Sequence, residues 1–234
     1  VMRTMRLSAC AVVCGWIGAC AAPAPDRAVR VPAVAGAFYP ESPAALKSAI
    51  EGYMRVQPDL GALEPAALIA PHAGYVYSGT CAAAAYTLVK GMKVARVIVL
   101  GPSHYGRFRG AALPDYALFR TPLGDVPVDA AAVGKLRANP LFSVQAEADR
   151  REHSIEVQVP FLQAALPSFT LLPVLVGALD GDDAAKAAEA LAPFAGEGTL
   201  LVASSDFTHF GARFGYTPFG RDIEARIRTL DYGA

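Results

Sequence analysis

The chain has 234 residues, of which 53% are hydrophobic, and its 21 basic side chains are balanced by 21 acidic ones. This balance argues against a broad basic surface for nucleic acid, and the apolar content excludes a disordered chain. The length is enough for one globular domain with a sizeable core. Cys10, Cys14 and Cys20 lie near the N-terminus and only Cys81 lies in the body, which excludes a disulfide framework.

The N-terminal residues have the pattern of an export signal. Arg3 and Arg6 precede an apolar run that ends in small residues before Cys20. The segment I-G-A-C resembles a bacterial lipobox, whose cysteine is acylated and becomes the new N-terminus. We therefore predict a signal peptide over residues 1–19, a lipid on Cys20 that holds the exported protein at a bacterial membrane, and a tether over 20–30. A cleaved secretory signal and a membrane anchor are the alternatives, although a spanning helix needs about 20 apolar residues.

From residue 31 onward, apolar runs of strand length alternate with segments of helical pattern. In chain order, the expected elements are a helix over 44–54 opened by Ser42-Pro43, a buried strand over 66–70, a helix over 81–90, a strand over 94–100, a hairpin or edge strands within 113–128, a helix from 129 to about 138, a helical segment over 154–166 in which Pro160 marks a kink or a later start, a strand over 169–176, a helix over 182–194, a strand over 199–203 and a helix over 221–230. This order predicts an α/β protein, a single α/β/α sandwich with a mainly parallel or mixed central sheet, over residues 31–234.

Three of the four histidines follow expected strands within a few residues. These are His72, His104 and His209, whereas His153 lies just before an expected helix. The carboxyl ends of strands in an open α/β sheet line the crevice where ligands bind, so imidazoles at these positions can converge. One such histidine alone is more often a hydrogen-bonded loop residue, but three in equivalent positions favour a divalent metal, because neutral imidazole commonly binds zinc, iron, copper and nickel.

Carboxylates also lie next to these histidines. Asp206, Glu152 and Glu156 could orient imidazoles or supply the oxygen of a two-histidine, one-carboxylate site. Glu156 fits equally well as an acidic residue that interacts with a helix dipole. A triad of Ser205, Asp206 and His209 would be confined to five consecutive residues, and such a short segment rarely reaches the required geometry.

Five short segments occur in an order that resembles the Memo family, which is called AmmeMemoRadiSam system protein B in bacteria. They are A-P-H-A-G-Y at 70–75, G-P-S-H at 101–104, E-H-S-I-E at 152–156, P-V-L-V-G at 173–177 and S-S-D-F-T-H at 204–209. All four histidines lie within these segments. The resemblance runs from about residue 31 to the end of the chain, and it implies a fold similar to the class III extradiol dioxygenases, whose Fe(II) is held by two histidines and a carboxylate.

The resemblance also implies a ligand set. Members of the Memo family are thought to bind iron or copper through the histidine of A-P-H-A-G-Y, the histidine of G-P-S-H and a cysteine near the C-terminus. Here the first two are His72 and His104, and zinc is a further candidate. Cys81 does not match the family's cysteine, so we expect either a chain truncated at its C-terminus or an incomplete site in which Asp206 or Glu156 substitutes.

Three functions remain open on this basis. In a dioxygenase-like oxidoreductase, the metal would bind an unidentified small-molecule substrate, while His153 and His209, with Asp206 beside the latter, would assist as acid or base without binding the ion. A non-catalytic metal-binding protein that serves a protein partner is the second, suggested by the family's association with a radical SAM protein. A metallohydrolase is the third. Membrane contact is expected only through lipid on Cys20.

Overall fold

The computed structural model describes residues 28–57, 65–218, 220 and 222–229; the expected signal peptide and most of the expected tether, including Cys20, lie outside them. The strands are β1 (Val29–Arg30), β2 (Ala67–Ala70), β3 (Arg96–Pro102), β4 (Ala111–Ala112), β5 (Leu118–Thr121), β6 (Gly124–Pro127), β7 (Phe142–Ser143), β8 (Thr170–Val176) and β9 (Thr199–Ser204). The α-helices are α1 (Pro43–Arg55), α2 (Tyr75–Thr87), α3 (Ala130–Leu136), α4 (Ala146–Arg151), α5 (Val159–Ala165), α6 (Gly181–Leu191) and α7 (Ile223–Arg228). Three short 3₁₀ helices are η1 (Glu156–Gln158), η2 (Ala192–Phe194) and η3 (Ala212–Phe214).

A six-stranded sheet in the order β2-β9-β3-β8-β4-β7 forms the centre of the molecule. Strands β2, β9, β3 and β8 run parallel to one another, and β4 is antiparallel to β8. The interior residues of β3 and β8 are almost all buried, as expected of central strands that are covered on both faces, and this explains their nearly continuous apolar sequences. The expected α/β sandwich with a mixed central sheet is confirmed.

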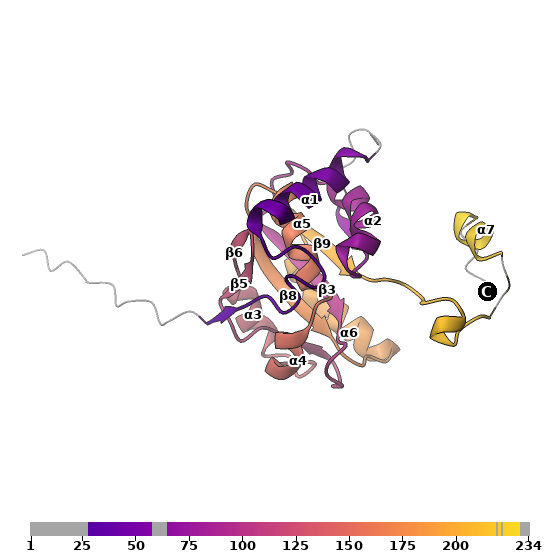
Figure 1. Cartoon of the computed structure of the whole chain (residues 1–234). Helices are drawn as coiled ribbons and strands as arrows, with labels where there is room; N and C mark the ends of the chain where they lie inside the picture. The colour runs from indigo at the N-terminus through magenta and orange to yellow at the C-terminus, as the bar shows by residue number, and fades with distance from the viewer. Residues whose placement is uncertain (1–27, 58–64, 219, 221, 230–234) are drawn as a thin grey trace, which may run out of the picture.

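Helices α1, α2 and α5 pack together beside this sheet (Figure 1). Gly79 allows α2 to approach α1 closely, because a Cβ atom at this position would lie 2.7 Å from the ring of Tyr53. The predicted start of α1 is also correct, with Ser42 at the N-cap and Pro43 in the first turn. These helices therefore hold the amino half of the chain against the sheet.

Helix α2 begins at Tyr75, six positions before the expected start at Cys81. The backbone N–H of Tyr75 donates to the carbonyl of Phe38 at 2.8 Å, and its buried hydroxyl donates to the carbonyl of Val157 at 2.7 Å. These tertiary contacts hold a first turn whose residues have the composition of a loop. Cys81 consequently lies in the middle of α2, where it is exposed and not buried as a small apolar side chain would be.

The periphery differs from the expectation in further details. Strand β2 is an edge strand with alternate side chains exposed, and Ile69 is 58% exposed. The hairpin within 113–128 is present as β5 and β6, but it forms a separate three-stranded sheet with β1. The segment over 154–166 starts as η1 and becomes α5, so Pro160 lies in the first α-helical turn, where its missing N–H removes no helical hydrogen bond.

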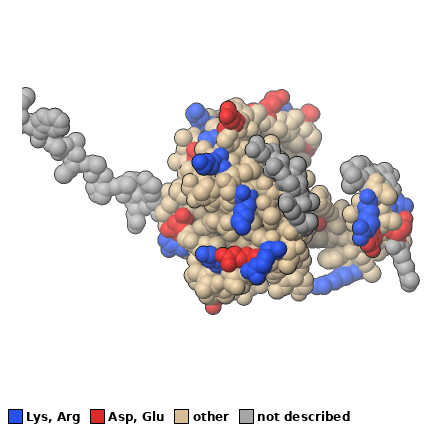
Figure 2. Space-filling view, turned by 90° about the horizontal axis from the view of Figure 1, so that it is seen from above, with Lys and Arg blue, Asp and Glu red and all other residues tan. Residues whose placement is uncertain are grey.

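After β9 the chain extends away from the sandwich, and α7 lies apart from it (Figure 1). On the face seen in Figure 2, acidic and basic side chains are interspersed, in keeping with the balanced composition. Among the described residues, no helix combines the length and apolar character needed to cross a bilayer.

Candidate metal centre

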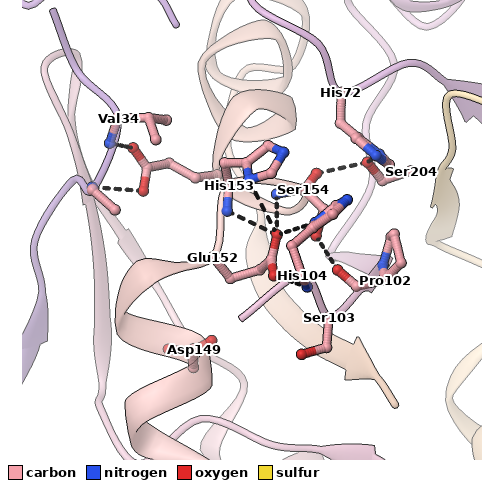
Figure 3. A network of polar contacts seen from close by, with 12 residues as sticks. Val34, His72, Pro102, Ser103, His104, Asp149, Glu152, His153, Ser154 and Ser204 are labelled. Atoms are coloured by element: carbon pink, nitrogen blue, oxygen red, sulfur yellow. Dashed lines mark hydrogen bonds and ion pairs between the residues drawn. The ribbon is translucent and has the colours of Figure 1, made fainter. Parts of the chain in front are cut away.

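Three imidazoles meet at the carboxyl end of the parallel strands. His72 follows β2, His104 follows β3, and His153 lies in the loop between α4 and η1. The ring centroids of His72 and His104 are 5.2 Å apart, and those of His104 and His153 are 4.4 Å apart. One nitrogen from each ring lies within 4.8 Å of the other two, so this group could hold a metal ion (Figure 3).

Glu152 connects two of these histidines. Its carboxylate accepts the backbone N–H groups of His104, His153 and Ser154 at 2.7, 2.9 and 2.9 Å, and its Oε1 lies 2.8 Å from Nδ1 of His104 (Figure 3). Burial alone would raise the pKa of Glu152, but the hydrogen bonds from His104 and Ser154 outweigh it and lower the pKa. An ionised carboxylate only accepts, so Nδ1 of His104 carries a hydrogen, and in the neutral form of this ring the lone pair lies on Nε2.

His72 is buried at the end of β2. Its backbone N–H donates to Oδ1 of Asp206 at 2.6 Å, and its Nδ1 lies 3.0 Å from Oγ of Ser204. Burial lowers the pKa of His72, although the charge of Asp206 acts in the opposite direction. The imidazole is therefore neutral at pH 7, the form in which histidine binds metals.

His153 has a buried Nδ1 atom with no hydrogen-bond partner among the described residues. This atom is 3.5 Å from Oε1 of Glu152, beyond good hydrogen-bonding distance, and the ring packs on Phe38 with centroids 4.8 Å apart. Burial lowers the pKa of His153, and the charge of Glu152 does not reverse this. Three imidazoles, two of them neutral at pH 7, and one unsatisfied polar atom make a donor set that fits a divalent transition metal.

The remaining two residues expected in the pocket lie at its side. Oδ2 of Asp206 is 3.8 Å from Nε2 of His72 and 3.7 Å from Nε2 of His209. The His209 side chain is 57% exposed and its ring contacts that of Phe214, with centroids 5.0 Å apart. The structure therefore brings His72, His104 and His153 together, with Asp206 next to His72 and His209 on the outer side of Asp206.

Glu156 lies in a different cluster. Its carboxylate accepts hydrogen bonds from Nη1 of Arg30 at 2.8 Å and from the hydroxyl of Tyr39 at 2.6 Å. The backbone N–H groups of Ala33 and Val34 donate to the same carboxylate at 2.8 and 3.0 Å. Glu156 does lie in the first turn of η1, as the helix-dipole interpretation expected. Both of its oxygen atoms are occupied by this cluster, which does not favour a role as a metal ligand.

Several residues that build the site were not among those expected from the sequence. A Cβ atom at position 101 would lie 2.5 Å from Oγ of Ser154, so only glycine lets the end of β3 approach the loop that carries His153. Gln158 and Ser204 contact each other behind His72. Gly101, Ser154 and Ser204 belong to the segments quoted above, which was an available signal, but nothing in the sequence pointed to Gln158.

Fold and site together define an α/β protein with a candidate metal centre at the carboxyl ends of parallel strands. A family model described as Memo-like protein matches residues 30–234. The chain is 37% identical over 206 residues to Protein MEMO1 of Xenopus laevis, a match that covers 84% of this chain and 69% of the relative. It is 36% identical over 206 residues to Protein MEMO1 of Homo sapiens, with 85% and 68% covered, and 42% identical over 159 residues to the Protein memo-1 homolog of Caenorhabditis elegans, with 66% and 45% covered. The chain belongs to the Memo family.

Proposed function

We propose that this protein binds iron or copper as a divalent ion through His72, His104 and His153. The observation that carries the proposal is the convergence of three imidazole nitrogens within 4.8 Å of one another. Nδ1 is engaged by Ser204 in His72 and by Glu152 in His104, which leaves Nε2 of both rings for the ion. The sequence suggested that His153 assists without binding, but its place in the cluster supports a ligand role.

We assign the bound ion to a dioxygenase-like oxidoreductase activity on a small-molecule substrate. When bound, iron or copper would supply a Lewis acid and a redox centre. Asp206 accepts the backbone N–H of His72 and so fixes the loop after β2. Its other oxygen lies 3.7 Å from Nε2 of the exposed His209, so the two side chains form a pair that can take up and hold a proton from a substrate hydroxyl.

Metal analysis of protein purified without air tests the binding proposal. We expect wild-type protein to contain iron or copper, and each of the variants His72→Ala, His104→Ala and His153→Ala to lose most of it. His209→Ala is the matched control and should keep the wild-type metal content, because its ring is outside the cluster. Wild-type metal content no higher than that of His72→Ala would refute the proposal.

Oxygen uptake with a panel of catechols tests the catalytic part. Uptake that requires both the metal and His209 supports the oxidoreductase assignment. Retained metal without uptake on any catechol would instead favour a metal-binding component that serves a protein partner, and metal-dependent hydrolysis without uptake would favour a metallohydrolase.

We further propose that the protein is exported and carries lipid on Cys20, on the strength of the sequence pattern alone. The acyl chains would hold the protein at a membrane surface. Mass spectrometry of the mature N-terminus in the native host checks this, and an unprocessed Cys20 without lipid would contradict it.

A further inference from the structure

A chain of buried polar groups lies behind His72. The hydroxyl of Tyr86 is 2.7 Å from Oε1 of Gln158, and Nε2 of Gln158 is 2.8 Å from Oγ of Ser204. Oγ of Ser204 is in turn 3.0 Å from Nδ1 of His72. Tyr86 and Gln158 have no exposed surface and Ser204 has 5%. These groups come from α2, η1 and β9, so only the folded structure brings them together.

The donors and acceptors in this chain can be assigned without ambiguity. Nε2 of Gln158 lies 2.9 Å from the carbonyl of Pro71, and a carbonyl only accepts, so the amide group must face Pro71 with its nitrogen. Oε1 of Gln158 therefore faces Tyr86 and accepts the phenolic hydrogen. The carbonyl of Pro71 thus fixes the amide orientation of Gln158, and the Tyr86 hydroxyl, which can donate or accept, adapts to it.

Ser204 transmits this orientation to the imidazole. Its hydroxyl has one hydrogen, which goes to the carbonyl of Ser154 at 2.6 Å (Figure 3). The oxygen accepts from Gln158 and has one lone pair left, which faces Nδ1 of His72. Nδ1 of His72 must then be the donor, and the hydrogen resides on Nδ1.

We propose that Ser204 and Gln158 are positioning residues that hold His72 in the Nδ1–H tautomer, so that Nε2 keeps the lone pair that a metal needs. The Ser204 hydroxyl and the Gln158 amide fix the tautomer of His72 as the Glu152 carboxylate fixes that of His104, but they carry no charge. The advantage of this tautomer rests on the proposed function, because groups that fix the tautomer of a metal-binding histidine raise its affinity for the ion. A neutral imidazole without such a partner can place its hydrogen on either nitrogen.

Nitrogen-15 NMR of the histidine rings in metal-free protein reads the tautomer directly. With four histidines in the chain, single His→Gln variants assign the signals. We expect wild-type His72 in the Nδ1–H form, a mixture or the Nε2–H form in Ser204→Ala, and return of the Nδ1–H form in Ser204→Thr, which keeps the hydroxyl. Ser78→Ala is the matched control, because Ser78 is also buried and donates to the carbonyl of Ala73 at 2.8 Å without contacting an imidazole.

Titration with Zn²⁺, a probe without redox chemistry, supplies the second measurement. Ser204→Ala should weaken binding roughly 10–100-fold, and Ser78→Ala should leave it unchanged. The inference is wrong if His72 is in the Nε2–H form in the wild type. It is also wrong if Ser204→Ala leaves either the tautomer of His72 or the Zn²⁺ affinity unchanged. Wild-type protein with His72 in the Nδ1–H form but no affinity for Zn²⁺, iron or copper would refute the proposed function and leave the tautomer assignment intact.

Discussion

At Glu152, one buried carboxylate accepts three backbone N–H groups and the Nδ1–H of His104. No lysine or arginine takes part in these bonds, so backbone N–H groups and the His104 ring compensate the charge. The carboxylate thereby fixes both the path of the loop through His153 and the orientation of the His104 ring. A glutamine side chain has the same shape, but its NH2 group would face at least one of these N–H groups and could not accept its hydrogen bond.

We therefore expect Glu152→Gln to lower the free energy of unfolding by about 1.5–3 kcal/mol, the range typical of hydrogen bonds to charged groups. Metal affinity should fall roughly 10–100-fold, because the His104 tautomer is no longer fixed. Urea unfolding of the metal-free protein and Zn²⁺ titration measure the two effects. Glu147→Gln, on the exposed surface of α4, is the control and should change stability by less than about 0.5 kcal/mol.

Among the secondary-structure elements, β1 and the loop that follows it are tied to η1 by Glu156. Burial and the adjacent carboxylate raise the pKa of Tyr39 well above its ordinary value, so its hydroxyl remains a donor at physiological pH. Because η1 follows directly from the His153 loop, the segment around residues 30–39 supports the candidate metal centre from outside.

Tyr39→Phe removes one hydrogen bond to this buried carboxylate, and we expect it to cost about 1.5–3 kcal/mol of unfolding free energy. Tyr77→Phe makes the same chemical change at a side chain that is 87% exposed, and should be nearly neutral. Equal midpoints for the two variants in urea unfolding would show that the Glu156 cluster does not stabilise the fold.

The junction between β3 and the His153 loop depends on the absence of a side chain at Gly101. Gly101→Ala should destabilise the protein by about 1–3 kcal/mol, because the added methyl group overlaps Ser154, and it should also weaken metal binding by moving His153. Gly52→Ala, in the interior of α1 with no atom near the added methyl group, should stabilise by about 0.5–1 kcal/mol. Thermal melts of the two variants should thus shift in opposite directions.

The elements that could be predicted from the sequence are those whose pattern is local and long enough to detect. Strands β3 and β8 have continuous apolar sequences, and α1 has an N-cap residue followed by proline. Strands β1, β4 and β7 have two residues each, too few for any periodicity. Tertiary contacts of Tyr75, which the sequence does not encode locally, decide where α2 begins.

The candidate site could be predicted only in part for the same reason. His72 and His104 were identifiable because each follows a strand, and parallel strands bring their carboxyl ends to one edge of the sheet. The packing of His153 against His104 depends on how a loop crosses that edge. The contact of Gln158 with Ser204 joins η1 to the end of β9, and no spacing along the chain reports such a contact.

For the molecule as a whole, the buried histidines link stability to pH. Burial lowers the pKa of His72 and of His153 below the ordinary value of about 6.5. Above that value both rings are neutral in the folded and unfolded states, so they contribute no pH dependence. As pH falls below it, the unfolded chain takes up protons that the folded protein does not, and unfolding becomes more favourable.

Urea unfolding with a chelator present should therefore give a lower free energy of unfolding at pH 5 than at pH 7. His153→Gln should reduce this difference, because one of the two responsible groups is gone. His209→Gln removes an exposed ring and should preserve it. The same pH dependence in all three proteins would mean that other groups cause it.

The order of strands in the sheet also bears on how the protein is made. Strand β9 lies between β2 and β3, and it is the only strand that pairs with β2 in the described part of the sheet. During synthesis, His72, His104 and His153 all leave the ribosome before β9 does. Until β9 inserts, β2 has no neighbour and His72 has no fixed distance from the other two rings. Such a long-range pairing is intrinsically slow to form, so an ion bound by these three rings would be loaded late, after β9 has been translated.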